Sequence, residues 1–120
     1  MYNALRDKGG HGSTKLHGDV ADAWNLLLHA NPVGGTADWH VFAQEDADAL
    51  AEYMRRKLGC KGNPIHHQQT YFTTSGLADL REETGIRPFV ISQKEGDMVF
   101  IPVGCPHQVR TSLFIFSNCY

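Results

Sequence analysis

Alternating apolar and polar positions predict a chain built mainly from short strands. Residues 37–42 show the pattern most simply, because Trp39 and Val41 alternate with His40 and Phe42. The mixed pattern of residues 14–29 predicts one longer extended segment. Three further strands and one hairpin turn are expected later in the chain: strands at residues 88–93, 98–102 and 109–116, with the turn at residues 94–97.

Two stretches follow a helical pattern instead. Apolar residues at helical spacing share one face of residues 45–58: Ala47, Leu50, Met54 and Leu58. Acidic residues in the first turn and basic residues in the last turn complement the helix dipole, and Gly59 supplies a stop. A shorter helix is expected at residues 75–83, ended by Gly85. Strands with two inserted helices predict a mainly β sandwich or barrel.

Composition narrows the class of protein. The 120 residues, 42% hydrophobic and 20% charged, fit one globular domain. A formal net charge of −2 provides no basic field for nucleic acid or a membrane surface. The sequence contains neither an apolar run long enough for a transmembrane helix nor a signal peptide. Three cysteines without C-x-x-C spacing indicate a reducing compartment, and seven histidines make metal binding the chemistry to test first.

The histidines and carboxylates contain one candidate metal site. His17 and Asp19 are two residues apart, and in a strand such residues point to the same face. His107 follows a strand and a tight bend, and it supplies a third donor. Two imidazoles and one carboxylate form the facial triad that holds non-haem iron(II) and leaves coordination positions open. The alternative reading of the pair is an exposed loop histidine beside a capping aspartate.

The residues after this pair add a candidate pocket. If the strand continues, Asn25 and two small residues share the face of His17 and Asp19, leaving space and an amide for hydrogen bonding. The opposite face then carries apolar residues that would pack in the core, interrupted by Asp22: Val20, Trp24, Leu26 and Leu28. Trp39 is likewise expected in the core.

Three blocks resemble a known family. They are GSTKLHGDVADAWN at residues 12–25, NPIHHQQTYF at residues 63–72 and GDMVFIPVGCPHQV at residues 96–109. All three are similar to motifs of JmjC domains, specifically those of the lysine-specific demethylase 3 (JHDM2-like) group. The resemblance covers roughly residues 12–110.

This resemblance implies a double-stranded β-helix, the jelly-roll or cupin-like JmjC fold. It implies an iron(II)- and 2-oxoglutarate-dependent dioxygenase that resembles histone H3 lysine 9 demethylases, which hydroxylate an N-methyl group and release formaldehyde. The matching positions make His17, Asp19 and His107 the iron ligands, and Thr14 and Asn25 contacts of 2-oxoglutarate. Strand parity places Thr14 on the face opposite His17, so its role requires a bend between them.

The resemblance also implies partners and a compartment. A methylated histone tail or another protein is the expected substrate, chromatin the expected association, and the nucleus the expected location, with no membrane partner. The chain divides into a loose segment at residues 1–11, a partial JmjC domain at residues 12–110 and a divergent tail at residues 111–120. We therefore expect a domain that is truncated at both ends.

Several positions depart from the family pattern. Residues 36–42 contain no lysine or arginine to pair the far carboxylate of 2-oxoglutarate, and Lys15 is read as a solvated charge rather than a substitute. We therefore expect this chain to show little demethylation. The alternatives are an inactive JmjC-like fragment that binds a metal or a protein, and a cupin-type small-molecule binder.

Overall fold

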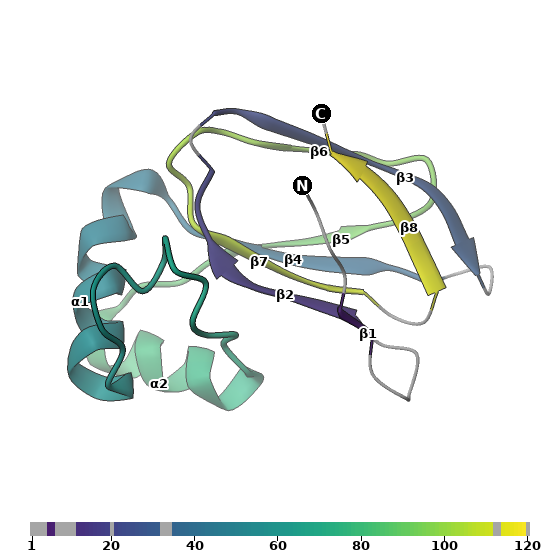
Figure 1. Cartoon of the computed structure of the whole chain (residues 1–120). Helices are drawn as coiled ribbons and strands as arrows, with labels where there is room; N and C mark the ends of the chain where they lie inside the picture. Colours follow the sequence, from purple (N-terminus) through teal and green to yellow (C-terminus); the bar gives the residue numbers. More distant parts are fainter. Residues whose placement is uncertain (1–4, 7–11, 20, 32–34, 112–113, 120) are drawn as a thin grey trace.

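Two antiparallel sheets face each other in the computed structural model, which describes residues 5–6, 12–19, 21–31, 35–111 and 114–119 (Figure 1). The larger sheet has five strands, in the order β1 (Leu5–Arg6), β2 (Gly12–His17), β7 (His107–Thr111), β4 (Ala37–Val41) and β5 (Phe89–Gln93). The smaller sheet has three strands, in the order β6 (Met98–Ile101), β3 (Ala23–Asn31) and β8 (Phe114–Cys119). The predicted mainly β jelly-roll with inserted helices is confirmed.

One hydrophobic core lies between the two sheets. It is formed by alternate residues of β4 and β6 together with Val109 of β7: Ala37, Trp39, Val41, Val99 and Ile101. Trp39 is 3% exposed, as its predicted core position requires. Because residues two apart on a strand share a face, the inner face of β7 that carries Val109 also carries His107. The packing of this core therefore directs His107, like Val109, toward the space between the two sheets.

A second core lies between the five-stranded sheet and the helices. The helices are α1 (Ala47–Leu58), preceded by a short 3₁₀ turn η1 (Gln44–Asp46), and α2 (Thr74–Thr84). Leu16 of β2 and Phe42 after β4 are completely buried there against residues of the helices and of the segments around α2: Leu50, Ala51, Tyr53, Met54, Ile65, Phe72, Leu80 and Ile86. The helices gather at one end of the sheets, near the end of β2 (Figure 1).

Both helices end as the sequence predicts. Gly59 and Gly85 take the left-handed conformation, with φ of 70° and 80°, in which a residue without a Cβ is not strained. α2 begins where the Thr73 side chain accepts a hydrogen bond from the Gly76 amide. One predicted core position is wrong, because Leu58 is 47% exposed while Tyr53 is buried.

The extended segment predicted at residues 14–29 is not one strand. β2 ends at His17 and β3 begins at Ala23 in the other sheet, so the chain crosses between sheets in the intervening connection. The strand predicted at residues 109–116 is also divided, into β7 and β8 of different sheets. The residues on both sides of each crossing have similar strand propensity. The alternation of apolar and polar residues therefore does not show where the chain passes from one sheet to the other.

The predicted core position of Trp24 is wrong. Its side chain is 46% exposed on the outer face of the three-stranded sheet, where its ring lies 4.5 Å from that of Phe100 between centroids. The inner face of β3 is instead the odd-numbered one, with Asn25 and Leu27 buried. Val20 lies outside the described residues, as does the side chain of Leu28. In the part of the chain that the structure describes, no helix is long and apolar enough to cross a membrane.

Candidate metal centre

The two predicted histidines meet on neighbouring strands. β2 and β7 are antiparallel, and His17 is the direct partner of His107 in their register. Residues directly opposite each other on such strands place their side chains on the same face. The two rings accordingly lie 4.3 Å apart between centroids. The pairing of β2 with β7 therefore brings together two residues that are 90 positions apart in the sequence.

An irregularity in β2 resolves the parity problem of Thr14. Thr14 is opposite Val109 and His17 is opposite His107, so three steps along β2 match two steps along β7. This is a β-bulge, which inserts one extra residue and shifts the facing of the strand. Because Val109 and His107 share the inner face, Thr14 and His17 both face inward. The bend that the role of Thr14 requires is present.

Two backbone contacts bring the connection after β2 against the bend before β7. The Gly104 amide donates to the Asp19 carbonyl over 3.4 Å, and the Val103 amide donates to Oδ1 of Asp22 over 2.7 Å. Gly104 has a φ of +81°, which allows the chain to turn sharply there. Asp22, which interrupts the apolar pattern of its segment, thus helps to hold Asp19 near His107.

The three predicted side chains converge with their donor atoms toward one another. Oδ1 of Asp19 lies 3.9 Å from Nε2 of His17, and Oδ2 lies 3.6 Å from Nε2 of His107. One donor atom from each residue lies within 4.8 Å of the others, which is the spacing of a group that can hold a metal ion. No other group of three such donors is found among the described residues. The predicted convergence is observed, and the role of these residues as ligands stays a prediction.

Hydrogen bonds fix the orientation of both rings. Nδ1 of His17 donates to the Lys15 carbonyl over 2.8 Å, and Nδ1 of His107 donates to the Cys105 carbonyl over 3.0 Å. With Nδ1 carrying the proton, each Nε2 presents a lone pair toward Asp19. Such outer hydrogen bonds fix the tautomer and raise the basicity of a ligating histidine. The arrangement therefore suits cation binding through both Nε2 atoms.

Burial keeps His107 neutral. Its side chain is only 5% exposed, and this burial lowers the pKa of His107. The hydrogen bond to the Cys105 carbonyl opposes that shift, the neighbouring His17 ring adds to it, and the Asp19 carboxylate opposes it. A neutral imidazole is the form that binds a metal ion. Two nitrogen donors and one oxygen donor without a thiolate match the ligand set of a divalent transition metal of the iron type.

Asn25, the second predicted cosubstrate residue, lies between the sheets and is 2% exposed. Its side-chain oxygen accepts from Nε2 of Gln93 over 3.2 Å, and its backbone carbonyl accepts from the same nitrogen over 2.9 Å. Gln93 also accepts from the indole N–H of Trp39 over 2.9 Å and donates to the Asp97 carbonyl over 3.0 Å. Gln93 thus joins the two sheets and fixes the orientation of the Asn25 amide.

Two further side-chain contacts were missed from the sequence, one made by a buried glutamine, Gln108, and one by an exposed aspartate, Asp22. Gln108 is fully buried, and its amide both accepts from the Phe72 amide and donates to the Phe72 carbonyl, which ties the segment before α2 to β7. The sequence offered a signal for both residues. Gln108 is a polar residue next to the candidate ligand His107, and Asp22 interrupts an apolar run. For Gln93 the sequence offers no such signal, because its partners are 54 and 68 residues away.

The remaining candidates lie away from the three donors. Lys15 is exposed, as its interpretation as a solvated charge predicts. His40 contacts Gln108 on the outer side of β7, and His66 and His67 are exposed. The inner-facing positions of β4 and β7 carry no lysine or arginine: Ala37, Trp39, Val41, His107, Val109 and Thr111. Cys105 is partly buried against the core between the sheets.

Comparisons with known proteins agree with this geometry. Residues 12–119 match the family described as "JmjC domain, hydroxylase". The chain is similar to "Lysine-specific demethylase JMJ29" of Arabidopsis thaliana, with 41% identity over 98 residues that cover 71% of the chain and 11% of the relative. It is also similar to human "Lysine-specific demethylase 3A", with 30% identity over 153 residues that cover 92% of the chain and 12% of the relative. The chain thus spans about an eighth or less of the length of these two relatives.

Proposed function

Because this chain belongs to the JmjC domain family, we propose that it is the iron(II)- and 2-oxoglutarate-dependent oxygenase domain of a histone lysine demethylase. The observation that carries the proposal is the convergence of His17, Asp19 and His107 within 4.8 Å. The names of the two similar proteins described above, both lysine-specific demethylases, support the reaction class. We further propose histone H3 lysine 9 as the substrate site and the nucleus as the location.

The residues of the site have two proposed roles, metal binding and orientation of the cosubstrate. His17, Asp19 and His107 would hold the iron through two nitrogens and one oxygen, a donor set that leaves coordination positions for other ligands. Bound iron(II) together with 2-oxoglutarate would supply the oxidation of an N-methyl group, which releases formaldehyde. Thr14 and Asn25 would orient the cosubstrate, since both face the space between the sheets. Gln93 would keep the Asn25 amide in one orientation.

Metal binding is the first test. Iron(II) under anaerobic conditions, or cobalt(II) as a redox-stable substitute, should raise the melting temperature, because a ligand that binds only the folded state stabilises it. His17→Ala, Asp19→Ala and His107→Ala should each abolish most of this gain. His66→Ala removes an exposed histidine outside the group and is the matched control. An unchanged gain in all three site variants would contradict the proposed ligand set.

Activity is the second test, and it separates the proposal from one alternative. Formaldehyde release from a methylated lysine 9 peptide, dependent on 2-oxoglutarate and lost in His107→Ala, would support the oxygenase. Metal binding without formaldehyde release would support an inactive family member. The lack of a cation at the inner-facing positions of β4 and β7 favours this second function, because the far carboxylate of 2-oxoglutarate needs a charged or hydrogen-bonding partner.

A further inference from the structure

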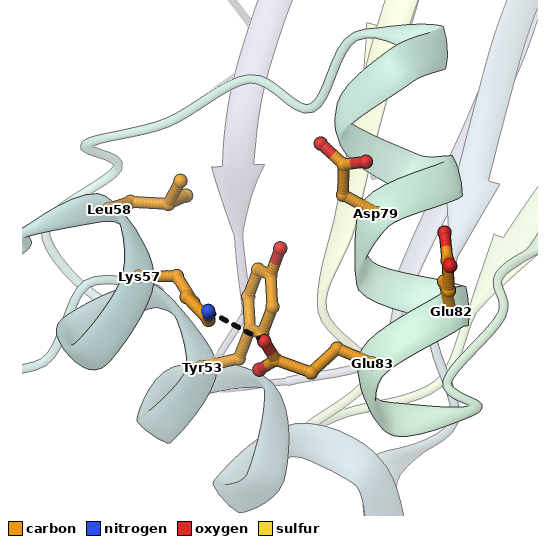
Figure 2. Close-up of a pocket in the computed structure, with 6 residues that line it drawn as sticks. All are labelled: Tyr53, Lys57, Leu58, Asp79, Glu82 and Glu83. Atoms are coloured by element: carbon orange, nitrogen blue, oxygen red, sulfur yellow. Dashed lines mark ion pairs between the residues drawn. The ribbon is translucent and has the colours of Figure 1, made fainter.

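A pocket of about 550 Å³ lies between α1 and α2, and it shares no residue with the metal centre. Its walls come from the last turns of α1 and from one face of α2 (Figure 2). The lining residues combine one aromatic, one aliphatic, one basic and three acidic side chains: Tyr53, Leu58, Lys57, Asp79, Glu82 and Glu83. Nothing in the proposed oxygenase reaction uses this pocket.

The three acidic residues are not equivalent. Glu83 is neutralised from α1, since Nζ of Lys57 and Nη2 of Arg56 each lie 2.8 Å from one of its carboxylate oxygens. These hydrogen bonds hold the pKa of Glu83 below its usual value. Asp79 and Glu82 make no ion pair or hydrogen bond with any described residue. With Glu83, these two carboxylates make three negative charges against the two positive charges of Arg56 and Lys57, so one net negative charge remains. Figure 2 shows Asp79 on the side of α2 that faces Tyr53.

Tyr53 is the second, independent observation. The residue is 5% exposed, and its ring packs between Phe72, 6.4 Å away between centroids, and the Arg56 guanidinium, 5.9 Å from the ring centroid. Among the residues that the structure describes, no group forms a hydrogen bond with the Tyr53 hydroxyl. Figure 2 shows this hydroxyl pointing into the space between Leu58 and Asp79. Buried hydroxyls normally have a partner, so a polar atom of a ligand is the group that this one lacks.

We propose that this pocket binds the side chain of a lysine in a basic peptide. An ammonium group carries three N–H donors, and the Tyr53 oxygen and the Asp79 carboxylate are acceptors on the facing sides of the pocket, with Glu82 adding negative charge to its lining. The aliphatic stem of a lysine would lie along Leu58, whose side chain is 47% exposed. The pocket is thus a site for a positively charged partner, and it operates without a metal or 2-oxoglutarate.

The test measures the binding of a fluorescent hexapeptide of alternating lysine and glycine by anisotropy at low salt. The double variant Asp79→Asn/Glu82→Gln should weaken binding about tenfold, as expected for the loss of one ion pair and one further negative charge of the lining. Its matched control is Asp48→Asn/Glu45→Gln, which removes two exposed charges at the start of α1 and should change binding less than twofold. Tyr53→Phe, which keeps the ring, should weaken binding by about threefold.

Three results would overturn the proposal. Equal weakening by both double variants would mean that only net charge attracts the peptide. Equal binding of a peptide with norleucine in place of lysine would exclude the ammonium as the recognised group. Competition by free n-butylamine at the concentration of the peptide would assign the pocket to a free alkylamine. Binding that persists in His17→Ala would show that it is independent of the metal centre, and therefore of the proposed function.

Discussion

The two sheets of this molecule differ in what covers their outer faces. At one end of the five-stranded sheet, Leu16 of β2 and Phe42, just after β4, are completely buried beneath the helices, while Val90 of β5 on the same outer side is 69% exposed. On the three-stranded sheet, Trp24, Met98 and Phe100 face outward and are between 41% and 52% exposed. The outward-facing residues of β4 and β7 are polar (Asp38, His40, Gln108 and Arg110), so the apolar contact with the helices is confined to one end of this sheet. The difference depends on where the chain places α1 and α2.

The metal centre lies where the chain passes between these two sheets. One crossing joins β2 to β3 and contains Asp19, and the other joins β6 to β7 and leads into His107. Both histidines belong to the five-stranded sheet, which packs against the helices at one end. The rigid, helix-supported sheet therefore fixes the two imidazoles, while hydrogen bonds between the crossings position the carboxylate.

The largest expected effect tests the contrast between covered and open faces. Phe42→Ala removes a fully buried ring beneath the helices and should lower the free energy of unfolding by about 3–5 kcal/mol. Trp24→Ala is the matched change on the open face, and it should cost less than about 1.5 kcal/mol, the upper range for an aromatic pair. Urea denaturation measures both. Equal losses would show that the outer face of the three-stranded sheet is covered in solution.

An intermediate effect is expected where the two sheets are joined. Gln93→Leu keeps the side chain about the same size but removes the acceptor of the Trp39 N–H and the hydrogen bonds that Gln93 donates to Asn25 and to the Asp97 carbonyl. The free energy of unfolding should fall by about 2–3 kcal/mol, the cost of leaving buried polar groups unsatisfied. Ser92→Ala, at an exposed position on the same strand, should change it by less than about 0.5 kcal/mol. A neutral Gln93→Leu would mean that burial alone holds the sheets together.

The smallest stability effect distinguishes the two glycine turns at the ends of β6. Gly104 and Gly96 both have positive φ, so alanine at either should cost about 1–2 kcal/mol. Only Gly104 donates to the Asp19 carbonyl, and a Cβ there would lie 2.8 Å from Nε2 of Gln44. Gly104→Ala should therefore also reduce the metal-induced rise in melting temperature, whereas Gly96→Ala should leave it intact. Equal metal responses would contradict the positioning role of this bend.

The elements that the sequence predicted well are those decided by local chemistry. α1 and α2 have apolar faces and glycine stops, and the β5–β6 hairpin has a turn signal, so each lies within two residues of its predicted bounds. The convergence of His17 with His107 was also predictable, since similarity to a family motif indicated it. Each of these predictions used only neighbouring residues or an ordered motif. The i and i+2 strand geometry expected for His17 and Asp19 is wrong, because β2 ends at His17 and Asp19 lies in the connection that follows.

The features that the sequence did not predict depend on contacts between distant segments. A crossing between sheets changes the partners of a strand but not its propensity, so the division of residues 14–29 was missed. The exposure of Trp24 depends on which sheet face the helices cover. The bond from Trp39 to Gln93 forms only after β4 and β5 pair, and nothing near either residue indicates it.

The bulge in β2 makes the length of this strand matter more than its composition. Between Thr14 and His17 the chain has one residue more than the facing strand, so a regular ladder with one residue fewer would span the same partners. Substitutions at Lys15, which is exposed, leave that count unchanged. Deleting Lys15 would restore the even count, with Thr14 and His17 again two positions apart and facing inward. That deletion would also remove the Lys15 carbonyl, which accepts the hydrogen bond from Nδ1 of His17, so the extra residue contributes to the orientation of the imidazole as well as to the register.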